Sequence, residues 1–429
     1  MRASREAAKP ALLRAMNLRT TFELVHAHGP MAAPQIVRAT GLSKPTISEV
    51  LGQLVDLGLL VRGGRTSGAP GPSAQLYDVN PRAGWVLSID VGRQWVRAAL
   101  SDLTGTIVSR SSSRTPKTAK AVITQMSAAV RDLTTDAGIE RADLSQVVVG
   151  TPGVILPGDD HLSLAPQLPG WERPQVVRTI RDALGAPVIF ENDVKLAAVG
   201  EHVDGVARGS DDFVLISLGT GIGMAAIVDG ALRRGASGLA GEISYLPLDV
   251  DGDRRHRQGT AWGTGDFESL VTSAAIEDLA ERNGLPRGEG AAGVFTAARR
   301  GDPRALRVVE IEARRLAYAV AAVATVLDPE LVVLGGGVGA GGGDLLLPLI
   351  VESLTAISPF SPRLAVSTLG ADAVIAGAKA SGMRIALDRI FGADLVLAPS
   401  SNGSSPPRPG RPAASNDVGA GHRRVASAG

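Results

Sequence analysis

Asn192 and Asp193 follow an apolar segment, Val188–Glu191, that is expected to form a strand. A side-chain amide beside a carboxylate supplies both donors and acceptors, which suits the recognition of two neighbouring hydroxyl groups. An Asn-Asp pair is also a common helix cap, and Val194–Val203 has the pattern of a helix. Under either interpretation, the pair stands where a strand ends and a helix begins.

Three turns contain glycine: Asp90-Val91-Gly92, Leu218–Gly223 and Gly335–Val338. The first two resemble the phosphate turns of the actin-like and sugar-kinase ATPase fold, and the third resembles its adenosine-side loop. Glycine lets the backbone approach a ligand closely, and successive amides in such a turn form a concave anion site. Arg93 and Gln94 follow the first turn and place two bulky side chains at this approach. The alternative is that the glycines only serve tight turns, and this is favoured for Gly335–Gly337.

A different chemistry is indicated at a predicted helix that begins at Ser43, a typical helix cap. Its apolar positions from Ile47 to Leu54 form one stripe, which leaves polar side chains on the other faces. A protein-binding helical bundle could share this pattern, but the strand, glycine-rich turn and strand that follow favour a DNA-binding wing. The expected DNA-binding residues are Ser43, Lys44, Thr46 and Ser48 of the helix, and Arg62 and Arg65 of the wing.

The predicted secondary structure changes near Arg82, from mainly short helices before it to strands and helices after it. Before it, helices are predicted over Leu12–Val25, Gln35–Ala39 and from Ser43 to about Leu57, with a wing strand at Gln75–Val79. After it, strands are predicted at Trp85–Ile89, Trp95–Leu100, Gln146–Val149, Val188–Glu191, Phe213–Leu218, Gly223–Val228 and Leu331–Leu334. Helices are predicted at Ala119–Ala137, Trp171–Leu184, Val194–Val203 and Asp302–Leu327. We therefore expect an α/β protein with a winged helix-turn-helix over residues 1–82 and a larger domain over 83–396.

Charge and composition support this division of the 429 residues. Residues 1–82 hold ten Lys and Arg against five Asp and Glu, whereas residues 83–396 hold 30 against 37, so only the first part suits a polyanion. The serine- and proline-rich residues 397–429 are expected to be disordered. There is no cysteine, and no uncharged apolar run of about 20 residues that would span a membrane. These features predict a cytoplasmic protein without membrane contact.

The segment from Leu13 to Gly64 resembles the DNA-binding domain of ROK-family repressors (repressor, open reading frame, kinase), and the similarity continues to about Gly382. The resemblance implies a two-lobed actin-like/sugar-kinase ATPase fold after the winged helix-turn-helix. It also implies that Asn192 and Asp193 bind sugar hydroxyls, with Asp193 as the general base in the kinases. The implied ligand-binding residues are Gly153, Gln167, Asn192, Asp193, Glu242, Tyr245 and Glu268.

The chain departs from the family pattern at several positions. Arg93 and Gln94 replace a Gly-Thr pair, Gln167 replaces an Asn, and Tyr245 replaces a His. The family's zinc loop has lost every cysteine, and His256 alone among arginines is a solvated loop residue rather than a ligand. In the wing, Gly71 stands where an arginine is common. We therefore expect no metal site, neither zinc nor ATP as a cofactor, and no catalytic residue beyond the vestigial base Asp193.

Together these patterns predict a sugar-responsive DNA-binding transcription regulator, a repressor of carbohydrate genes, with a catalytically degenerate kinase-like sensor. The alternative is an ATP-dependent sugar kinase with an added DNA-binding module. A third interpretation is a constitutive DNA-binding protein whose second domain only dimerises. The expected partners are a DNA operator, a small sugar or sugar derivative as effector, and further copies of the chain in a homodimer or homotetramer.

Overall fold

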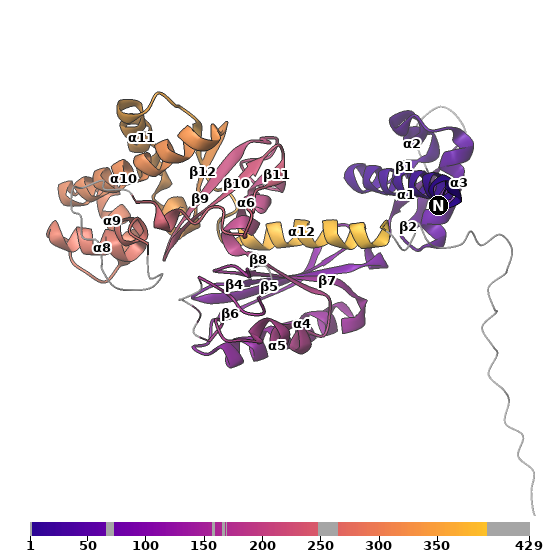
Figure 1. Cartoon of the computed structure of the whole chain (residues 1–429), viewed down its shortest axis with the longest axis horizontal. Coiled ribbons are helices and arrows are strands. Elements are labelled where there is room, and N and C mark those ends of the chain that lie inside the picture. The colour runs from indigo at the N-terminus through magenta and orange to yellow at the C-terminus, as the bar shows by residue number, and fades with distance from the viewer. Residues whose placement is uncertain are drawn as a thin grey trace, which may run out of the picture.

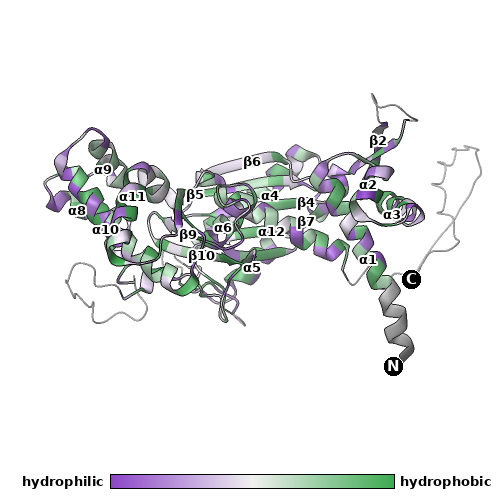
Figure 2. Ribbon diagram, turned by 90° about the horizontal axis from the view of Figure 1, so that it is seen from above, coloured by the Kyte–Doolittle hydropathy of each residue, from purple (hydrophilic) through white to green (hydrophobic). Residues whose placement is uncertain are grey.

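The structure is a computed structural model that describes residues 2–65, 73–156, 159–164, 168, 170–247 and 265–392. Four features that the sequence singles out lie outside these residues: Gln167, Gly71, His256 and the tail 397–429. The described part of the chain is elongated. Figures 1 and 2 show helices α1–α3 at one end and helices α8–α11 at the other, with two sheets between them.

The N-terminal end is a winged helix-turn-helix, as predicted. Its helices are α1 (Arg2–His28), α2 (Ala33–Thr40) and α3 (Lys44–Asp56), and its strands β1 (Met31–Ala32), β2 (Leu60–Arg65) and β3 (Gln75–Val79) pair in the order β1-β3-β2. The predicted cap of α3 is confirmed, because Ser43 Oγ accepts the backbone amide of Thr46 at 3.3 Å. The apolar stripe of α3, including Ile47 and Leu54, packs against Phe22 of α1 in the core of this domain.

The first lobe of the larger domain is a five-stranded sheet in the order β6-β5-β4-β7-β8. The strands are β4 (Trp85–Val91), β5 (Trp95–Asp102), β6 (Ile107–Arg114), β7 (Leu144–Thr151) and β8 (Val188–Asn192). Helices α4 (Ala119–Ala137) and α5 (Val176–Leu184) cover one face, and α6 (Asp193–Val203) and α12 (Ala373–Ile390) cover the other (Figure 1). The helix predicted over Trp171–Leu184 is shorter in the structure, because α5 begins only at Val176.

The second lobe is a five-stranded sheet in the order β11-β10-β9-β12-β13. Its strands are β9 (Phe213–Leu218), β10 (Ile222–Val228), β11 (Ala231–Leu232), β12 (Leu331–Gly335) and β13 (Arg363–Val366). Its helices are α7 (Glu268–Val271), α8 (Ser273–Arg282), α9 (Gly290–Arg299), α10 (Pro303–Leu327) and α11 (Gly336–Ile357). Short 3-10 helices occur at Pro81–Ala83, Arg141–Asp143, Ile243–Tyr245 and Gly370–Asp372. This sheet and α6 share an apolar core, so α6 lies between the two lobes.

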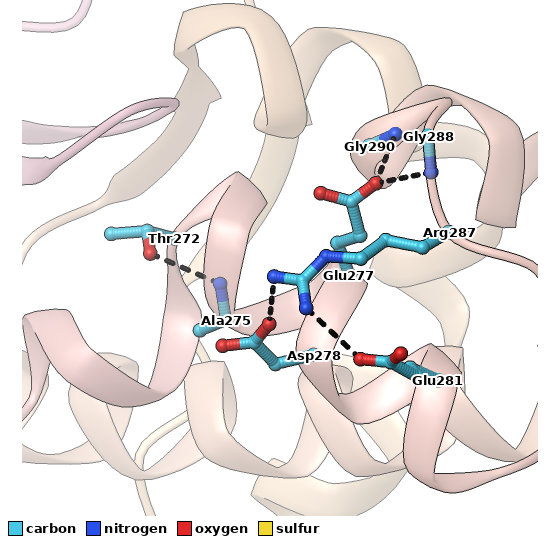
Figure 3. Close-up of polar contacts among 8 residues, drawn as sticks. All are labelled: Thr272, Ala275, Glu277, Asp278, Glu281, Arg287, Gly288 and Gly290. Carbon is cyan, nitrogen blue, oxygen red and sulfur yellow. Dashed lines mark hydrogen bonds and ion pairs between the residues drawn. The ribbon is translucent and has the colours of Figure 1, made fainter.

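The far end of the second lobe is held by polar contacts between α8 and the loop that follows it (Figure 3). Glu277 accepts the backbone amides of Gly288 at 2.7 Å and Gly290 at 3.2 Å. Arg287 pairs with Asp278 at 2.5 Å and with Glu281 at 3.0 Å. These bonds fix the loop that connects α8 to α9, and they pair the charged groups of Glu277, Asp278, Glu281 and Arg287 within this region.

Helix α11 is the one helix of the described residues that is long and apolar enough to cross a membrane. In this fold it is part of the core of the second lobe, where Leu346, Ile350 and Leu354 are buried.

Helices α6 and α12 of the larger domain are in close contact. A Cβ atom added at Gly377 of α12 would lie 1.8 Å from the Leu196 carbonyl oxygen, and one added at Gly200 of α6 would lie 2.3 Å from the Ala373 carbonyl oxygen. Only glycine permits such an approach, so the two backbones touch directly. The opposite end of α12 packs on the winged helix-turn-helix. There Arg19 of α1 pairs with Asp388 at 2.7 Å and the Phe22 and Phe391 rings are 5.6 Å apart.

Replacement of a glycine by alanine should have opposite effects on stability at this contact and at a helical glycine away from it. Gly377→Ala should force α6 and α12 apart and lower the free energy of unfolding by about 1–3 kcal/mol or more. Gly341→Ala in α11 meets nothing within 4 Å, so its gain in helix propensity, up to about 1 kcal/mol, should leave stability unchanged or raised. Urea unfolding of the two variants checks this. Equal stabilities would contradict the close contact.

Candidate ligand site and DNA interface

A pocket of about 220 Å³ opens between the two lobes. Of the seven ligand-binding residues predicted from the sequence, it brings six together: Gly153, Asn192, Asp193, Glu242, Tyr245 and Glu268. The seventh, Gln167, lies outside the described residues. The first lobe supplies Gly153 and Asn192, and the second lobe supplies the two glutamates and Tyr245. A ligand held by all of them would contact both lobes at once.

Asn192 and Asp193 occupy the junction of β8 and α6. Asn192 Oδ1 accepts the Lys195 amide at 3.2 Å and its Nδ2 donates to the Gly153 carbonyl oxygen at 3.4 Å. Asp193 Oδ1 accepts the Val194 amide at 2.8 Å. The pair therefore caps the helix and lines the pocket at the same time, so the two interpretations of the sequence do not compete.

Four carboxylates gather at or behind this pocket, and burial is the largest cause of a raised pKa at each. Burial raises the pKa of Asp193, of Glu242 and of Glu268. At Glu242 the charge of Lys195 opposes this rise, and the charges of Asp193 and Glu268 add to it. Asp90 of β4 is 5 % exposed. Its burial and the nearby charge of Asp193 raise its pKa to about 7, although Arg97, 3.2 Å away, opposes this. The site therefore favours protonated or hydrogen-bonded carboxyl groups.

Lys195 is a buried residue of this site that the sequence analysis does not single out. It is 2 % exposed, and its ammonium donates to the Gly238 carbonyl oxygen. Burial lowers the pKa of Lys195, while the charges of Glu191 and Glu242 act in the opposite direction. The Lys195 bond ties the segment before Glu242 to α6, and the 2.7 Å pair between Arg234 and Glu191 ties it to β8. The sequence signal that could have identified Lys195 is its position as a single charged residue in the apolar run Val194–Val199.

Tyr245 lines the pocket from the short 3-10 helix Ile243–Tyr245 and is 37 % exposed. Partial burial and the charges of Glu242 and Glu268 raise its pKa. Its hydroxyl is therefore a neutral donor and acceptor near neutral pH. Among the residues that the structure describes, no three histidine or carboxylate side chains are grouped to hold a metal ion.

Both backbone polar groups of Gly92, in the first glycine turn, are hydrogen-bonded to residues of neighbouring strands and loops. The Gly92 amide donates to the Trp95 carbonyl oxygen at 2.9 Å, and the Thr115 hydroxyl donates to the Gly92 carbonyl oxygen at 2.7 Å. Arg93 lines the pocket beside Gly219–Gly223. At the third turn, a Cβ on Gly336 would lie 2.4 Å from the Leu218 carbonyl oxygen, so this glycine serves backbone packing at the start of α11.

The predicted DNA-binding residues lie at the start of α3 and on the wing. Lys44, Ser48 and Arg62 are exposed, and their side chains form no hydrogen bond or ion pair within the described part of the chain. Ser43 and Thr46 share a hydroxyl hydrogen bond of 2.8 Å. Arg65 donates to the Ser73 carbonyl oxygen at 2.7 Å and thereby joins the end of β2 to the segment just before β3.

Comparison with known families agrees with both parts of the structure. The model of the ROK family matches residues 86–380, about two thirds of the chain, and that of the IclR helix-turn-helix domain matches residues 23–64. The chain belongs to the ROK family. This confirms the resemblance and the two-lobed α/β fold expected from the sequence, and the helix-turn-helix match identifies a DNA-binding domain beside the ROK domain.

Relatives of this ROK protein include both kinases and regulators. A glucokinase of Halalkalibacterium halodurans is 29% identical over 68% of this chain and 93% of its own length. A xylose repressor of Bacillus subtilis is 26% identical over 58% of this chain and 64% of its own. A crystal structure of a ROK family transcriptional regulator, described as a homolog of the E. coli MLC protein, covers 90% of this chain and 100% of its own. It superposes with a TM-score of 0.72 at 21% identity.

The raised pKa of Asp90 predicts a specific dependence of stability on pH. The Asp90 carboxyl keeps its proton in the folded state up to a pH of about 7, whereas in the unfolded state it releases the proton near pH 3.9. Its contribution to the free energy of unfolding is therefore full below about pH 3.9 and is lost as the pH rises toward 7. Between pH 5 and 7 the wild type should lose about 2 kcal/mol more unfolding free energy than Asp90→Asn.

Urea unfolding across this pH range measures the difference. Asp132→Asn is the control, because that carboxylate is 60% exposed, and its profile should run parallel to the wild type. Parallel profiles for the wild type and Asp90→Asn would show that Asp90 is ionised throughout.

Proposed function

We propose that the protein is a sugar-responsive DNA-binding transcription regulator, a repressor of carbohydrate genes, whose kinase-like domain is a sensor without catalytic activity. The observation that carries this proposal is the continuous packing from the ligand pocket to the DNA-binding domain. Helix α6 begins at the pocket with Asp193 and touches α12, and α12 packs on α1. The xylose repressor among the relatives has a name that agrees with this function.

The effector site proposed here uses Gly153, Gln167, Asn192, Asp193, Glu242, Tyr245 and Glu268. Amide, carboxyl and phenol groups that face one pocket suit a small polyhydroxylated ligand such as a sugar. Because both lobes contribute contacts, ligand binding favours closure of the lobes around the pocket. That motion would act on α12 and so on the position of the DNA-binding domain.

The DNA contacts proposed here begin with Lys44, Ser48 and Arg62, whose side chains are unengaged in the described structure. Lys44 stands in the first turn of α3, which is the part of a recognition helix that reaches base edges in the major groove. Ser43, Thr46 and Arg65 would exchange their internal hydrogen bonds for contacts with DNA. A single short helix reads few bases, so we expect a homodimer or homotetramer on a repeated site in the cytoplasm.

The kinase alternative rests on Asp193, which stands at the position of the family's general base, and on the turn Gly219–Gly223. We favour a vestigial role for Asp193, because the Gly92 amide is engaged within its own hairpin and Arg93 occupies the approach to the phosphate turns. Phosphoryl transfer depends on positioning at this point. We further propose that neither ATP nor zinc is a cofactor, since the chain has no cysteine and has Tyr245 at the family's histidine position.

Operator affinity measured with and without sugar tests both parts of this proposal. With an operator selected from random duplexes by the wild type, a sugar from a panel of hexoses, pentoses and amino sugars should change the affinity at least about 5-fold. Asp193→Ala should abolish that change and keep the affinity of the unliganded protein. Lys44→Ala combined with Thr46→Ala should abolish specific binding with little change in the melting temperature, because both residues lie at the surface.

Three outcomes would contradict parts of the proposal. An operator affinity that no sugar changes would favour a constitutive DNA-binding protein. ADP release at about 1 per second or faster with any sugar of the panel would favour the kinase. Unchanged binding by the Lys44 and Thr46 double variant would remove α3 as the recognition helix.

A further inference from the structure

Glu49 is an acidic side chain on the exposed face of α3, the proposed recognition helix. Ile47 and Val50 belong to the buried stripe of this helix, and with about 3.6 residues per turn Glu49 and Gly52 lie on the opposite face. The Glu49 side chain is 63 % exposed. Attraction to phosphate groups comes from basic residues, so a carboxylate on a surface that meets DNA is not there to raise non-specific affinity.

Two donors hold one oxygen of this carboxylate and leave the other available. Glu49 Oε1 accepts hydrogen bonds from Arg14 Nη2 of α1 at 3.1 Å and from Gln53 Nε2 of α3 at 3.0 Å. Glu49 Oε2 has no hydrogen-bond partner within the described part of the chain. An exposed ion pair adds little to stability, so the main consequence of these bonds is an oriented carboxylate with one free acceptor.

A carboxylate in the major groove can distinguish bases by the hydrogen-bond donors that they present. It accepts hydrogen bonds and donates none, and only cytosine N4 and adenine N6 are donors at this edge of the bases. In adenine the acceptor N7 lies beside N6 and repels a carboxylate oxygen, whereas cytosine has no acceptor beside N4. Glu49 Oε2 therefore suits cytosine best.

Gly52 gives a second, independent indication that another molecule lies against this face of α3. It is in the interior of the helix, where glycine is less favourable than alanine. A Cβ atom added at Gly52 would meet no atom within 4 Å, so the fold itself does not require glycine there. The missing side chain, one turn after Ser48 and Glu49, allows the helix to approach the floor of a groove closely.

We propose that Glu49 is a specificity-determining residue that selects cytosine through its N4 amino group, and that Gly52 lets α3 approach the bases closely enough for this contact. Arg14 and Gln53 act as positioning residues for the carboxylate. The inference rests on the proposed function, because it requires α3 to be the recognition helix. Its effect is on base preference rather than on total affinity, since contacts with phosphates carry no sequence information.

Selection from random DNA duplexes by the wild type and by Glu49→Gln tests the base contact. The variant should change the preferred base at one position of each half-site from cytosine to adenine, because a glutamine amide can pair with adenine N6 and N7 together. At that position, replacement of C·G by any other pair should weaken wild-type binding at least about 5-fold. Glu23→Gln is the control, because it removes the same charge from an exposed residue of α1 and should select the wild-type operator.

Two further variants test the surroundings of Glu49. Gly52→Ala should keep or raise the stability to urea, because its Cβ meets no atom, and should weaken operator binding at least about 10-fold by holding the helix away from the bases. Arg14→Ala should lose part of the discrimination between C·G and A·T at the Glu49 position, since only Gln53 still holds Oε1.

The outcomes separate this inference from the proposed function. An unchanged operator for Glu49→Gln, or an affinity that rises equally for all duplexes, would overturn the base contact and leave the regulator standing. Wild-type affinity in Gly52→Ala would overturn the close approach of α3, and full discrimination in Arg14→Ala would overturn the positioning role of Arg14. Failure of the wild type to select any sequence would overturn the DNA-binding regulator itself.

Discussion

The backbone contact between α6 and α12 is the constraint on which the rest of the architecture depends. Because Gly200 and Gly377 carry no side chains, the two helices touch along their main chains and cannot slide without a clash. At its N-terminus, α6 holds the Asn192–Asp193 pair of the ligand pocket. The pocket is therefore attached to α12 by packing, and not only by the chain connection.

From α12 the packing continues into the DNA-binding domain. Leu387 and Phe391 share a core with Phe22 of α1, and the pair of Arg19 with Asp388 adds a polar contact at the edge. Figure 1 shows this single helix running from α6 to the winged helix-turn-helix. A kinase needs no such connection between its substrate site and a DNA-binding domain, whereas a regulator needs a two-state element that both sites can bias. Helices α6 and α12 can serve as that element, because a movement of the lobes around the pocket would move α12 against α1.

Sequence patterns predicted the parts with strong local signals and missed those without them. The Ser43 cap, the wing strands and the α/β alternation were evident, and six of the seven expected ligand residues meet in one pocket. Helix α12 was missed because it is packed on several sides and is rich in Ala and Gly, so it has no amphipathic stripe. Strand β1 has two residues, and the polar edge strand β6 resembles a loop. The role of Lys195 depends on Gly238, 43 positions away, which no local pattern encodes.

Hydrogen–deuterium exchange of the 429-residue chain, with and without the tightest-binding sugar, tests the central claim that the pocket acts on the DNA-binding domain through α12. Ligand should change amide protection at the pocket, along Ala373–Ile390 of α12 and in the part of α1 that packs on it, and Asp193→Ala should show none of these changes. Each protected amide reports local opening, so the route of coupling appears directly in the peptides that respond. A ligand that shifts operator affinity while protection changes at the pocket alone, with α12 and α1 unaffected, would contradict the account.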